Sequence, residues 1–438
     1  MSSEKPTIWK LNQGADRRIR AQHPWVFSNE LAQSPKGLPP GSPIRLLDSK
    51  GSFVASGYGN PHSLIAFRAL SFDSRLANPC EPEELISQVI SAWGHRSVLG
   101  YNKSFRLIYG EADFIPGLVV DRYLVEQNGK RAQVFAAQIL TAGIQHAIGQ
   151  NIESFFRRVV EESHLSSLSE FNWESSAVVL RNDVQIRKLE GLEVEEPRLV
   201  KSIDGFNFSD IDILIAPVEG VEPIRMACDL MDGQKTGFFL DQAHNIQLVC
   251  EQLKKSSSWE KPVRILDLCC YVGQWSTQLV RMLKAMDLTA EVTAVDVSES
   301  ALKFAQKNIS LEGAVVLTQK LDVLEQLSVL PDKHFDIVIA DPPAFIKAKK
   351  DIPTGKHAYL KMNTSAFRMV QRGGWVVSCS CSGLLEEREF MDVIGKALRR
   401  QELQARCLLR GGHSADHPNL MSFSEGFYLK MFLHQVIY

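Results

Sequence analysis

Four aspartates and one cysteine in the second half of the sequence lie at or just after the ends of apolar runs. They are Asp267, Asp296, Asp322, Asp341 and Cys381. A carboxylate can bind an ammonium group or ribose hydroxyls, and a thiol can act as a nucleophile. The carboxyl ends of neighbouring parallel strands meet at the sheet edge where open α/β proteins bind ligands. If the apolar runs are such strands, these five side chains share one site.

The first of these runs predicts how a ligand is held there. Residues 264–276 have the pattern of an apolar strand, a short loop containing Gly273, and the start of a helix. The loop lacks Gly-x-Gly-x-x-Gly, so a pyrophosphate cradle for NAD or FAD is not indicated. We expect Gly273 to let the backbone approach a compact ligand and Asp267 to bind an ammonium group. Asp296 would hold ribose hydroxyls and Asp322 an adenine amine, which together indicate S-adenosylmethionine (SAM).

The fourth run ends in Asp341-Pro-Pro-Ala-Phe345. The prolines stiffen this loop and hold Asp341 at the strand edge, where it can face a base placed beside the methyl donor. Pro342 and Phe345 are then expected to contact the nucleic-acid substrate.

Alternating strands and helices must position these residues. Strands are predicted at 263–269, 292–297, 315–318, 335–340 and 374–379, with helices at 274–284, 299–311, 356–372 and 386–401. Apolar strands that alternate with helices predict a parallel, Rossmann-like α/β sheet covered on both faces. Two late runs, 403–409 and 426–437, are expected to pair antiparallel at one edge.

The front of the chain has a different pattern. Residues 8–70 predict short strands of a small barrel with a hairpin turn at 48–51, and residues 76–195 mix strands with helices at 83–97 and 144–162. Residues 1–75 carry ten Lys and Arg against five Asp and Glu, a net charge of about +5. A basic segment suits contact with phosphates, although a solvated basic face without a partner explains the charge equally well.

Composition limits the protein class. The chain has 438 residues, 45% of them hydrophobic and 23% charged, with a net charge of −2. These values are typical of a soluble globular protein with two or three domains, and no signal peptide or membrane span is recognisable. Eight scattered cysteines without metal-ligand spacing predict neither a disulfide framework nor a metal site. We expect a cytoplasmic protein.

Several longer strings carry a resemblance to a known family. Residues 232–242, 341–345 and 378–383 together resemble the bacterial 23S rRNA cytosine-C5 methyltransferases of the large-subunit methyltransferase I type. Residues 14–20, 23–30 and 58–62 resemble that family's PUA domain, an RNA-binding pseudo-barrel. Residues 106–123 and 187–191 resemble its central α+β domain of the EEHEE type, and 416–418 recur near its C-terminal edge strands.

The resemblance implies three domains and two sets of contacts. The domains are a PUA domain at 1–75, a central domain at 76–195 and a SAM-dependent methyltransferase domain at 196–438. Phe239, Asp241 and Gln242 would lie over the SAM site and its entrance, and Asp341 would join the cofactor contacts. The substrate would be 23S rRNA or a large-subunit precursor, and a homodimer stays open. The first loop reads Cys269-Cys-Tyr-Val-Gly-Gln-Trp275, where relatives usually have Phe-Ser-Tyr-Thr-Gly-Gly-Phe.

The front segment supplies the expected RNA contacts. Arg17, Arg18 and Arg20 precede His23 and Trp25, which combines cations for phosphates with rings for stacking.

Cytosine C5 is a poor nucleophile, and a thiolate that adds to C6 activates it. Cys381 is the expected nucleophile, because the family motif matches Ser-Cys-Ser-Gly there, whereas Cys379 is expected to be a buried strand residue. Asp341 would bind the cytosine edge. Two alternatives stay open. One is methylation of an exocyclic amine of adenine or guanine, and the other is a non-catalytic RNA-binding or assembly factor.

Overall fold

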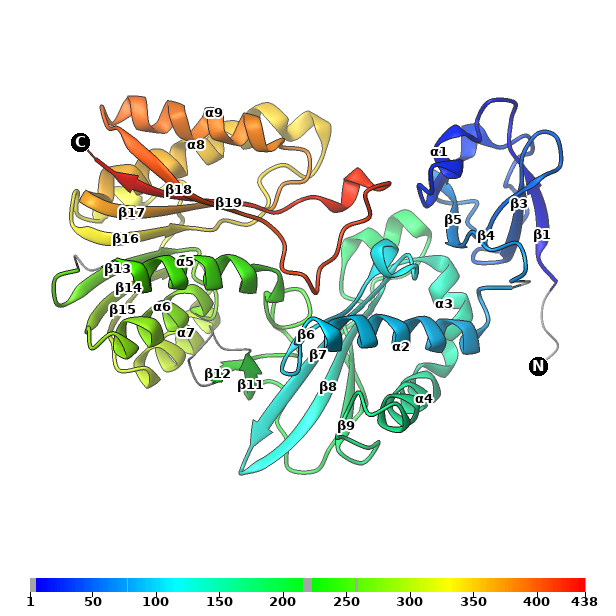
Figure 1. The fold of residues 1–438 in the computed structure, drawn as a ribbon, viewed down its shortest axis with the longest axis horizontal. Coiled ribbons are helices and arrows are strands. Elements are labelled where there is room, and N and C mark those ends of the chain that lie inside the picture. The colour runs from blue at the N-terminus through cyan, green and yellow to red at the C-terminus, as the bar shows by residue number, and fades with distance from the viewer. Residues whose placement is uncertain (1–4, 77, 216–222, 257–258, 438) are drawn as a thin grey trace. The chain divides into compact units, whose positions relative to one another are not determined.

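The computed structural model describes residues 5–76, 78–215, 223–256 and 259–437. The chain divides into two compact units (Figure 1). Unit 1 consists of Met1–Leu214, Asp229–Leu240 and Ala415–Ser424, and unit 2 of Ile215–Cys228, Asp241–Ser414 and Glu425–Tyr438.

The N-terminal part of unit 1 is a small five-stranded sheet in the order β1-β3-β4-β5-β2. Its elements are β1 (Thr7–Lys10), α1 (Arg17–Arg20), β2 (Trp25–Phe27), β3 (Pro43–Leu47), β4 (Phe53–Gly59) and β5 (Ile65–Ser71). The predicted hairpin turn lies between β3 and β4, where the Asp48 carboxylate accepts hydrogen bonds from the backbone N–H groups of Lys50 (2.9 Å) and Ser52 (2.8 Å). Trp9, Leu46 and Phe67 are buried in its core.

A larger mixed sheet forms the rest of unit 1. Its strands run in the order β10-β9-β8-β7-β11, and β6 also pairs with β7. The elements are α2 (Pro82–Val98), β6 (Phe105–Tyr109), β7 (Leu118–Gln127), β8 (Lys130–Ile139), α3 (Ala142–Ile148), α4 (Ile152–Leu165), β9 (Ser176–Leu180), β10 (Arg198–Lys201) and β11 (Ile211–Ile215). Trp93 of α2 and Phe156 of α4 pack against Phe135 of the sheet.

Two features of this sheet differ from the sequence prediction. The single helix expected over 144–162 is two helices, because the chain makes a 3-10 turn at Gly149–Asn151. Strands β10 and β11 lie beyond residue 195 and yet pair with β9 and β7. The compact units therefore do not divide at 195/196, and the three-domain division remains a prediction.

Unit 2 is a seven-stranded sheet in the order β15-β14-β13-β16-β17-β19-β18. Its strands are β13 (Val263–Leu268), β14 (Ala290–Asp296), β15 (Val315–Lys320), β16 (Phe335–Ala340), β17 (Val370–Ser380), β18 (Ala405–Gly411) and β19 (Lys430–Val436). The first five are parallel, and β18 and β19 form the predicted antiparallel edge. Strand β12 (Ile224–Cys228) also belongs to this unit.

Helices cover both faces of this sheet, as a Rossmann-like α/β fold requires (Figure 1). The helices are α5 (Ala243–Lys255), α6 (Gln274–Ala285), α7 (Glu299–Leu311), α8 (Ile352–Met369) and α9 (Glu387–Arg400). Side chains of α5, α6 and α7 share one apolar core with the sheet, and those of α8 and α9 share the other. No helix among the described residues is long and apolar enough to cross a membrane.

Candidate active site

The predicted carboxylates meet at the carboxyl edge of the unit 2 sheet. Asp267 lies opposite Ala294 of β14 and Ile339 of β16, Asp296 is the last residue of β14, and Asp341 follows β16. Burial raises the pKa of the Cys269 thiol well above its ordinary value, and the charges of Asp296, Asp341, Asp267 and Asp322 raise it further. The fold therefore brings all four aspartates close to one loop.

Asp267 is fully buried and only partly satisfied. Its Oδ2 accepts hydrogen bonds from Ser276 Oγ (2.7 Å) and the Ser276 backbone N–H (3.3 Å), whereas Oδ1 is buried without a hydrogen-bond partner among the described residues. Burial raises the Asp267 pKa to about 7, and the charges of Asp341 and Asp296 add to the shift. An orphaned carboxylate oxygen among like charges attracts a cation.

These residues fit SAM, which carries an ammonium and a sulfonium charge. Asp267 would hold the ammonium through its orphaned oxygen. The carboxylate oxygens of Asp296 accept the backbone N–H groups of Tyr271 and Ser298, both at 2.9 Å, and each oxygen has a further lone pair for a ribose hydroxyl.

The loop after β13 has an unusual backbone. Cys269, Tyr271 and Gly273 all have positive φ, of 61°, 50° and 81°. A side chain at Gly273 would meet Ile309 Cδ1 at 3.0 Å and Ala305 Cα at 3.1 Å, both on α7. The glycine thus allows the close approach of α7, and its expected contact with the ligand remains a prediction. Asp322 is exposed and caps its own turn by accepting the Leu324 N–H at 2.7 Å.

Asp341 is held by two hydrogen-bond donors. Gln242 Nε2 lies 2.9 and 2.8 Å from its two carboxylate oxygens, and Trp275 Nε1 donates to Oδ2 at 2.9 Å. Gln242 is fixed in turn, because its Oε1 accepts from Asn245 Nδ2 at 2.6 Å. Asp341 is thereby oriented at the strand edge by Gln242 and Trp275, two residues that the loop sequence did not indicate.

The two candidate cysteines have different surroundings. Cys379 is fully buried, and burial raises the pKa of its thiol well above the ordinary value, with the charge of Asp341 as the next cause. Cys381 is half-buried just after β17, with its Sγ 3.7 Å from the carbonyl oxygen of Pro342. Cys381 therefore lies beside the Asp341 loop and retains an exposed surface.

The two other residues of that loop that were expected to contact the substrate, Pro342 and Phe345, differ in burial. Pro342 is buried, and its carbonyl faces Cys381. Phe345 is half-buried, with its ring 4.8 Å from that of Tyr359.

The three residues expected over the SAM site, Phe239, Asp241 and Gln242, do not all belong to the same compact unit. Asp241 and Gln242 belong to unit 2, where Asp241 accepts the Tyr428 hydroxyl at 2.5 Å. Phe239 belongs to unit 1, where Lys235 Nζ lies 4.4 Å above its ring.

The three arginines predicted to contact RNA differ in whether their side chains already form ion pairs within the chain. Arg18 donates to the Trp25 carbonyl oxygen (3.2 Å) and to Glu30 (3.4 Å), and Arg20 pairs with Asp16 and Asp48, each at 2.6 Å. Arg17 is exposed and forms no ion pair with the described residues.

The aromatic pair is packed inside unit 1. His23 is buried, and the Phe423 ring lies 5.5 Å from it and 4.7 Å from the Trp25 ring. Trp25 Nε1 also donates to Glu111 at 2.8 Å. The His23 ring is therefore buried, whereas Trp25 is half-buried, and its expected contact with RNA remains a prediction.

Sequence reasoning missed several contacts at the site. Trp275, Ser276, Tyr428 and Lys430 were not singled out, although all four lie at the site edge. Lys430 had a recognisable signal, because it is a charged residue at the start of the apolar run Met431-Phe-Leu433. The hydrogen bonds of Trp275 and Tyr428 join residues 66 and 187 positions apart, which periodicity cannot indicate.

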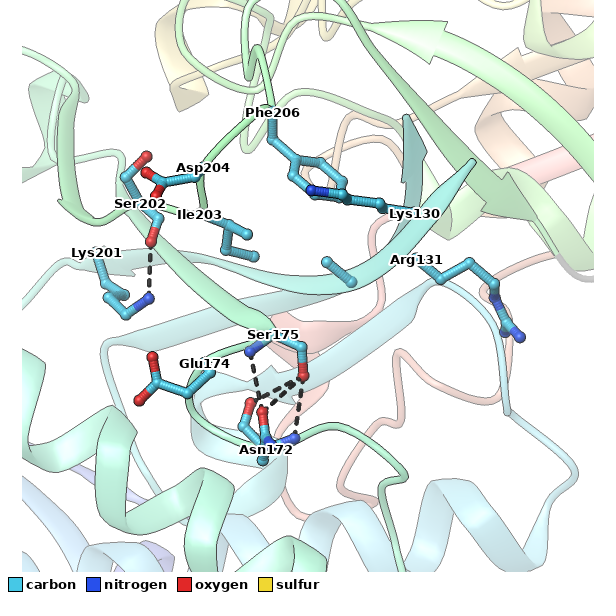
Figure 2. A pocket seen from close by; sticks show the side chains of 11 residues that line it. Lys130, Arg131, Asn172, Glu174, Ser175, Lys201, Ser202, Ile203, Asp204 and Phe206 are labelled. Carbon is cyan, nitrogen blue, oxygen red and sulfur yellow. Dashed lines mark hydrogen bonds between the residues drawn. The ribbon is translucent and has the colours of Figure 1, made fainter. Parts of the chain in front are cut away.

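Unit 1 contains a separate hollow of about 710 Å³ beside β8 and β10 (Figure 2). Lys130, Lys201 and Phe206 line it, and hydrogen bonds join Asn172 to Ser175 and Lys201 to Ser202. None of the predicted site residues lines this hollow.

Family models match two regions of the chain. Residues 10–72 match the PUA-like domain, and residues 249–404 match the FtsJ-like methyltransferase. Two solved structures have the same overall fold. One is described as a SAM-dependent methyltransferase from Streptococcus mutans (TM-score 0.70, 17% identity, 98% of this chain and 99% of that one), and the other as a methyltransferase in complex with SAH (TM-score 0.70, 17% identity, 99% and 100%).

Curated relatives match over almost the whole chain. Proteins named ribosomal RNA large subunit methyltransferase I are 27% identical in Erwinia tasmaniensis, over 98% of both chains, and 29% identical in Pseudoalteromonas translucida, over 96% of this chain and 97% of that one. The chain is therefore a nearly full-length homologue of the ribosomal RNA large subunit methyltransferase I proteins, with a PUA-like domain followed by a class I, SAM-dependent methyltransferase domain.

Proposed function

We propose that this protein methylates C5 of a cytosine in 23S rRNA, in the cytoplasm, through a covalent bond between Cys381 and C6 of the base. The relatives that match over almost the whole chain are named for the large-subunit ribosomal RNA, and this RNA is therefore the proposed substrate. The observation that carries the C5 chemistry is the half-buried Cys381 thiol, whose Sγ lies 3.7 Å from the Pro342 carbonyl in the loop that begins at Asp341.

The residues of the chain divide the work between binding and covalent activation. Asp267 and Asp296 would hold the cofactor, which when bound supplies an electrophilic methyl group. Asp341, fixed by Gln242 and Trp275, would accept a hydrogen bond from the edge of the cytosine and stabilise charge during addition.

Cys381 would act twice on the base. Its thiolate forms a bond to C6, and the electron pair of the C5–C6 double bond becomes available at C5 for methylation. A base then removes the C5 proton, the double bond forms again, and the thiolate leaves C6. Cys381 is thus regenerated, and the only lasting change in the RNA is the methyl group on C5.

A mechanism-based trap tests this chemistry. In RNA with 5-fluorocytosine at the target, no proton can leave C5, so SAM should produce a protein–RNA adduct that survives denaturation. Cys381→Ala should abolish both adduct and turnover, whereas the matched Cys379→Ala should keep both, with some loss of stability from its buried position. Nucleoside mass spectrometry of ordinary substrate RNA should detect 5-methylcytosine.

Other outcomes would redirect the proposal. An adduct that persists in Cys381→Ala and disappears in Cys379→Ala transfers the role to the neighbouring cysteine. Full methylation by both single variants and by the double variant ends the covalent mechanism and favours methylation of an exocyclic amine. The absence of any new methyl group would favour a non-catalytic role.

A further inference from the structure

The buried lysine Lys430 lies beside the proposed nucleophile and has no role in the chemistry described above. It is the first residue of β19, directly opposite Ser380 in the antiparallel pairing with β17, one residue before Cys381. It is 7% exposed. A lysine is rarely buried to this extent without a specific partner, because its charge loses hydration there.

The hydrogen bonds of Lys430 fix its ammonium group at the loop that contains Cys381. Nζ donates to the carbonyl oxygens of Ser382 at 2.7 Å and Leu385 at 2.6 Å. An ammonium group has three N–H donors, and the third has no hydrogen-bond partner among the described residues. Neither partner is a carboxylate, so the positive charge is not neutralised by a hydrogen-bonded anion.

The electrostatic surroundings connect this charge to the thiol. Burial lowers the pKa of Lys430 to about 8, and the charge of Cys381 opposes that shift. The same attraction must favour the Cys381 thiolate whenever Lys430 is protonated. Among the described residues near Cys381, Asp341 and Cys379 are anionic when charged and therefore disfavour a second negative charge. Tyr359, whose pKa burial raises to about 12, is neutral.

We propose that Lys430 is a positioning residue for the covalent step, whose ammonium stabilises the Cys381 thiolate and so keeps the nucleophile ionised near neutral pH. The inference rests on the proposed function for its purpose, since a thiolate is needed only if Cys381 attacks the base. Lys430 keeps its own proton throughout, and the proton of the thiol passes to solvent. The effect is present while Lys430 is charged and is lost as pH rises above about 8.

Alkylation by iodoacetamide measures the thiolate without RNA or cofactor. The rate at Cys381 is followed by mass spectrometry as a function of pH in the full-length chain, with Cys379→Ala as the background so that the peptide carries one thiol. Lys430→Gln removes the charge but keeps two N–H donors for the two carbonyls. We expect it to move the midpoint of Cys381 alkylation to higher pH and to slow the reaction at pH 7 about tenfold.

Three controls isolate the charge. Lys430→Arg keeps a cation and should retain the wild-type midpoint. Tyr359→Phe removes a buried hydroxyl, bonded to Ser382 Oγ at 2.8 Å, from the same surroundings without changing the charge, and should leave the midpoint unchanged. Cys407, exposed on β18, should react alike in every variant.

Equal midpoints in wild type and Lys430→Gln, or an equal shift in Tyr359→Phe, would overturn the inference. If Lys430→Gln does not fold, the folded wild-type protein is compared with its urea-unfolded form. Equal pH midpoints of Cys381 alkylation in the two would show that the fold does not stabilise the thiolate, and would overturn the inference. The fluorocytosine trap reports separately on the proposed function. An adduct together with a midpoint independent of Lys430 rejects only this inference, and a Lys430-dependent midpoint without an adduct rejects only the covalent mechanism.

Discussion

At the scale of single residues, we expect the buried Asp267 carboxyl to make the binding of SAM depend on pH. Its pKa of about 7 in the folded chain is well above the ordinary value, so the folded chain holds this proton where the unfolded chain has lost it. The stability of the cofactor-free protein therefore decreases as pH rises from about 4 to about 7. A cationic ligand needs the ionised carboxylate, so binding of the ligand must release the proton.

We expect the affinity for SAM to increase as pH rises towards 7, by up to about tenfold per pH unit, and binding at pH 6 to release up to about one proton. Calorimetry in buffers of different ionisation enthalpy measures both quantities. Asp267→Asn is the matched control: it keeps the size of the side chain, should bind SAM more weakly, and should show little pH dependence. An equally steep dependence in Asp267→Asn would show that another group titrates.

At the scale of elements, Asn308 of α7 connects its own helix to β12 and to the loop that follows β13. Its side chain donates to the carbonyl oxygens of Ala227 (3.0 Å) and Val272 (2.9 Å) and accepts the Ala227 N–H at 2.8 Å, and it is 1% exposed. It therefore fixes β12 and the loop after β13 against α7.

Replacement of Asn308 by Ala should lower the free energy of unfolding by about 2–4 kcal/mol, because three buried backbone groups lose their partner. The affinity for SAM should also decrease, since Val272 is part of the loop that ends at Gly273. Denaturant unfolding and calorimetry measure these effects. Lys303→Ala, an exposed change on the same helix, should alter neither quantity, and an unchanged stability in Asn308→Ala would contradict this role.

Among the arginines of helix α1, we expect Arg17 to contribute most to RNA binding, because Arg18 and Arg20 are engaged in ion pairs within the chain. Arg17→Glu should weaken RNA binding and lower the slope of its salt dependence by about one, while SAM binding stays intact. Arg20→Glu is a poorer test, because it would place a third carboxylate between Asp16 and Asp48. Lys36→Glu changes the net charge equally at another exposed position, and an equal effect there would show that only overall charge matters.

Much of the unit 2 sheet was predictable because its strands are continuous apolar runs, and helix α7 was predicted at its observed bounds, Glu299–Leu311. The common edge of Asp267, Asp296 and Asp341 follows from the same periodicity. The direction of a side chain such as Trp275 does not, because it depends on packing between distant segments. Strand β10 was missed because its four residues, Arg198–Lys201, lack a clear alternation. Strand β11 was missed although residues 210–213 alternate between aspartate and isoleucine.

At the scale of the whole molecule, unit 1 depends on a segment from near the end of the chain. The Asp416 carboxylate accepts the Arg106 N–H at 2.8 Å, and Arg96 donates to the Asp416 carbonyl oxygen at 2.9 Å. Phe423 of the same segment packs on Trp25. Residues more than 300 positions apart thus form one core region.

A fragment that ends at residue 195 should therefore not unfold cooperatively, because it lacks β10, β11 and Asp416. Asp416→Ala in the full chain should lower the midpoint of the unit 1 transition, since the buried Arg106 N–H loses its acceptor at a cost of about 1–3 kcal/mol. Scanning calorimetry compares the two proteins with wild type. A sharp transition of native midpoint from the fragment would contradict this dependence.

The interleaved chain also constrains how such a protein can change over generations. A domain encoded by one uninterrupted stretch of a gene can be transferred to another gene by a single recombination event. Unit 1 is encoded in three stretches, the last of which, Ala415–Ser424, lies within the coding region of unit 2. No single exchange can therefore transfer the whole of unit 1 without also transferring part of unit 2.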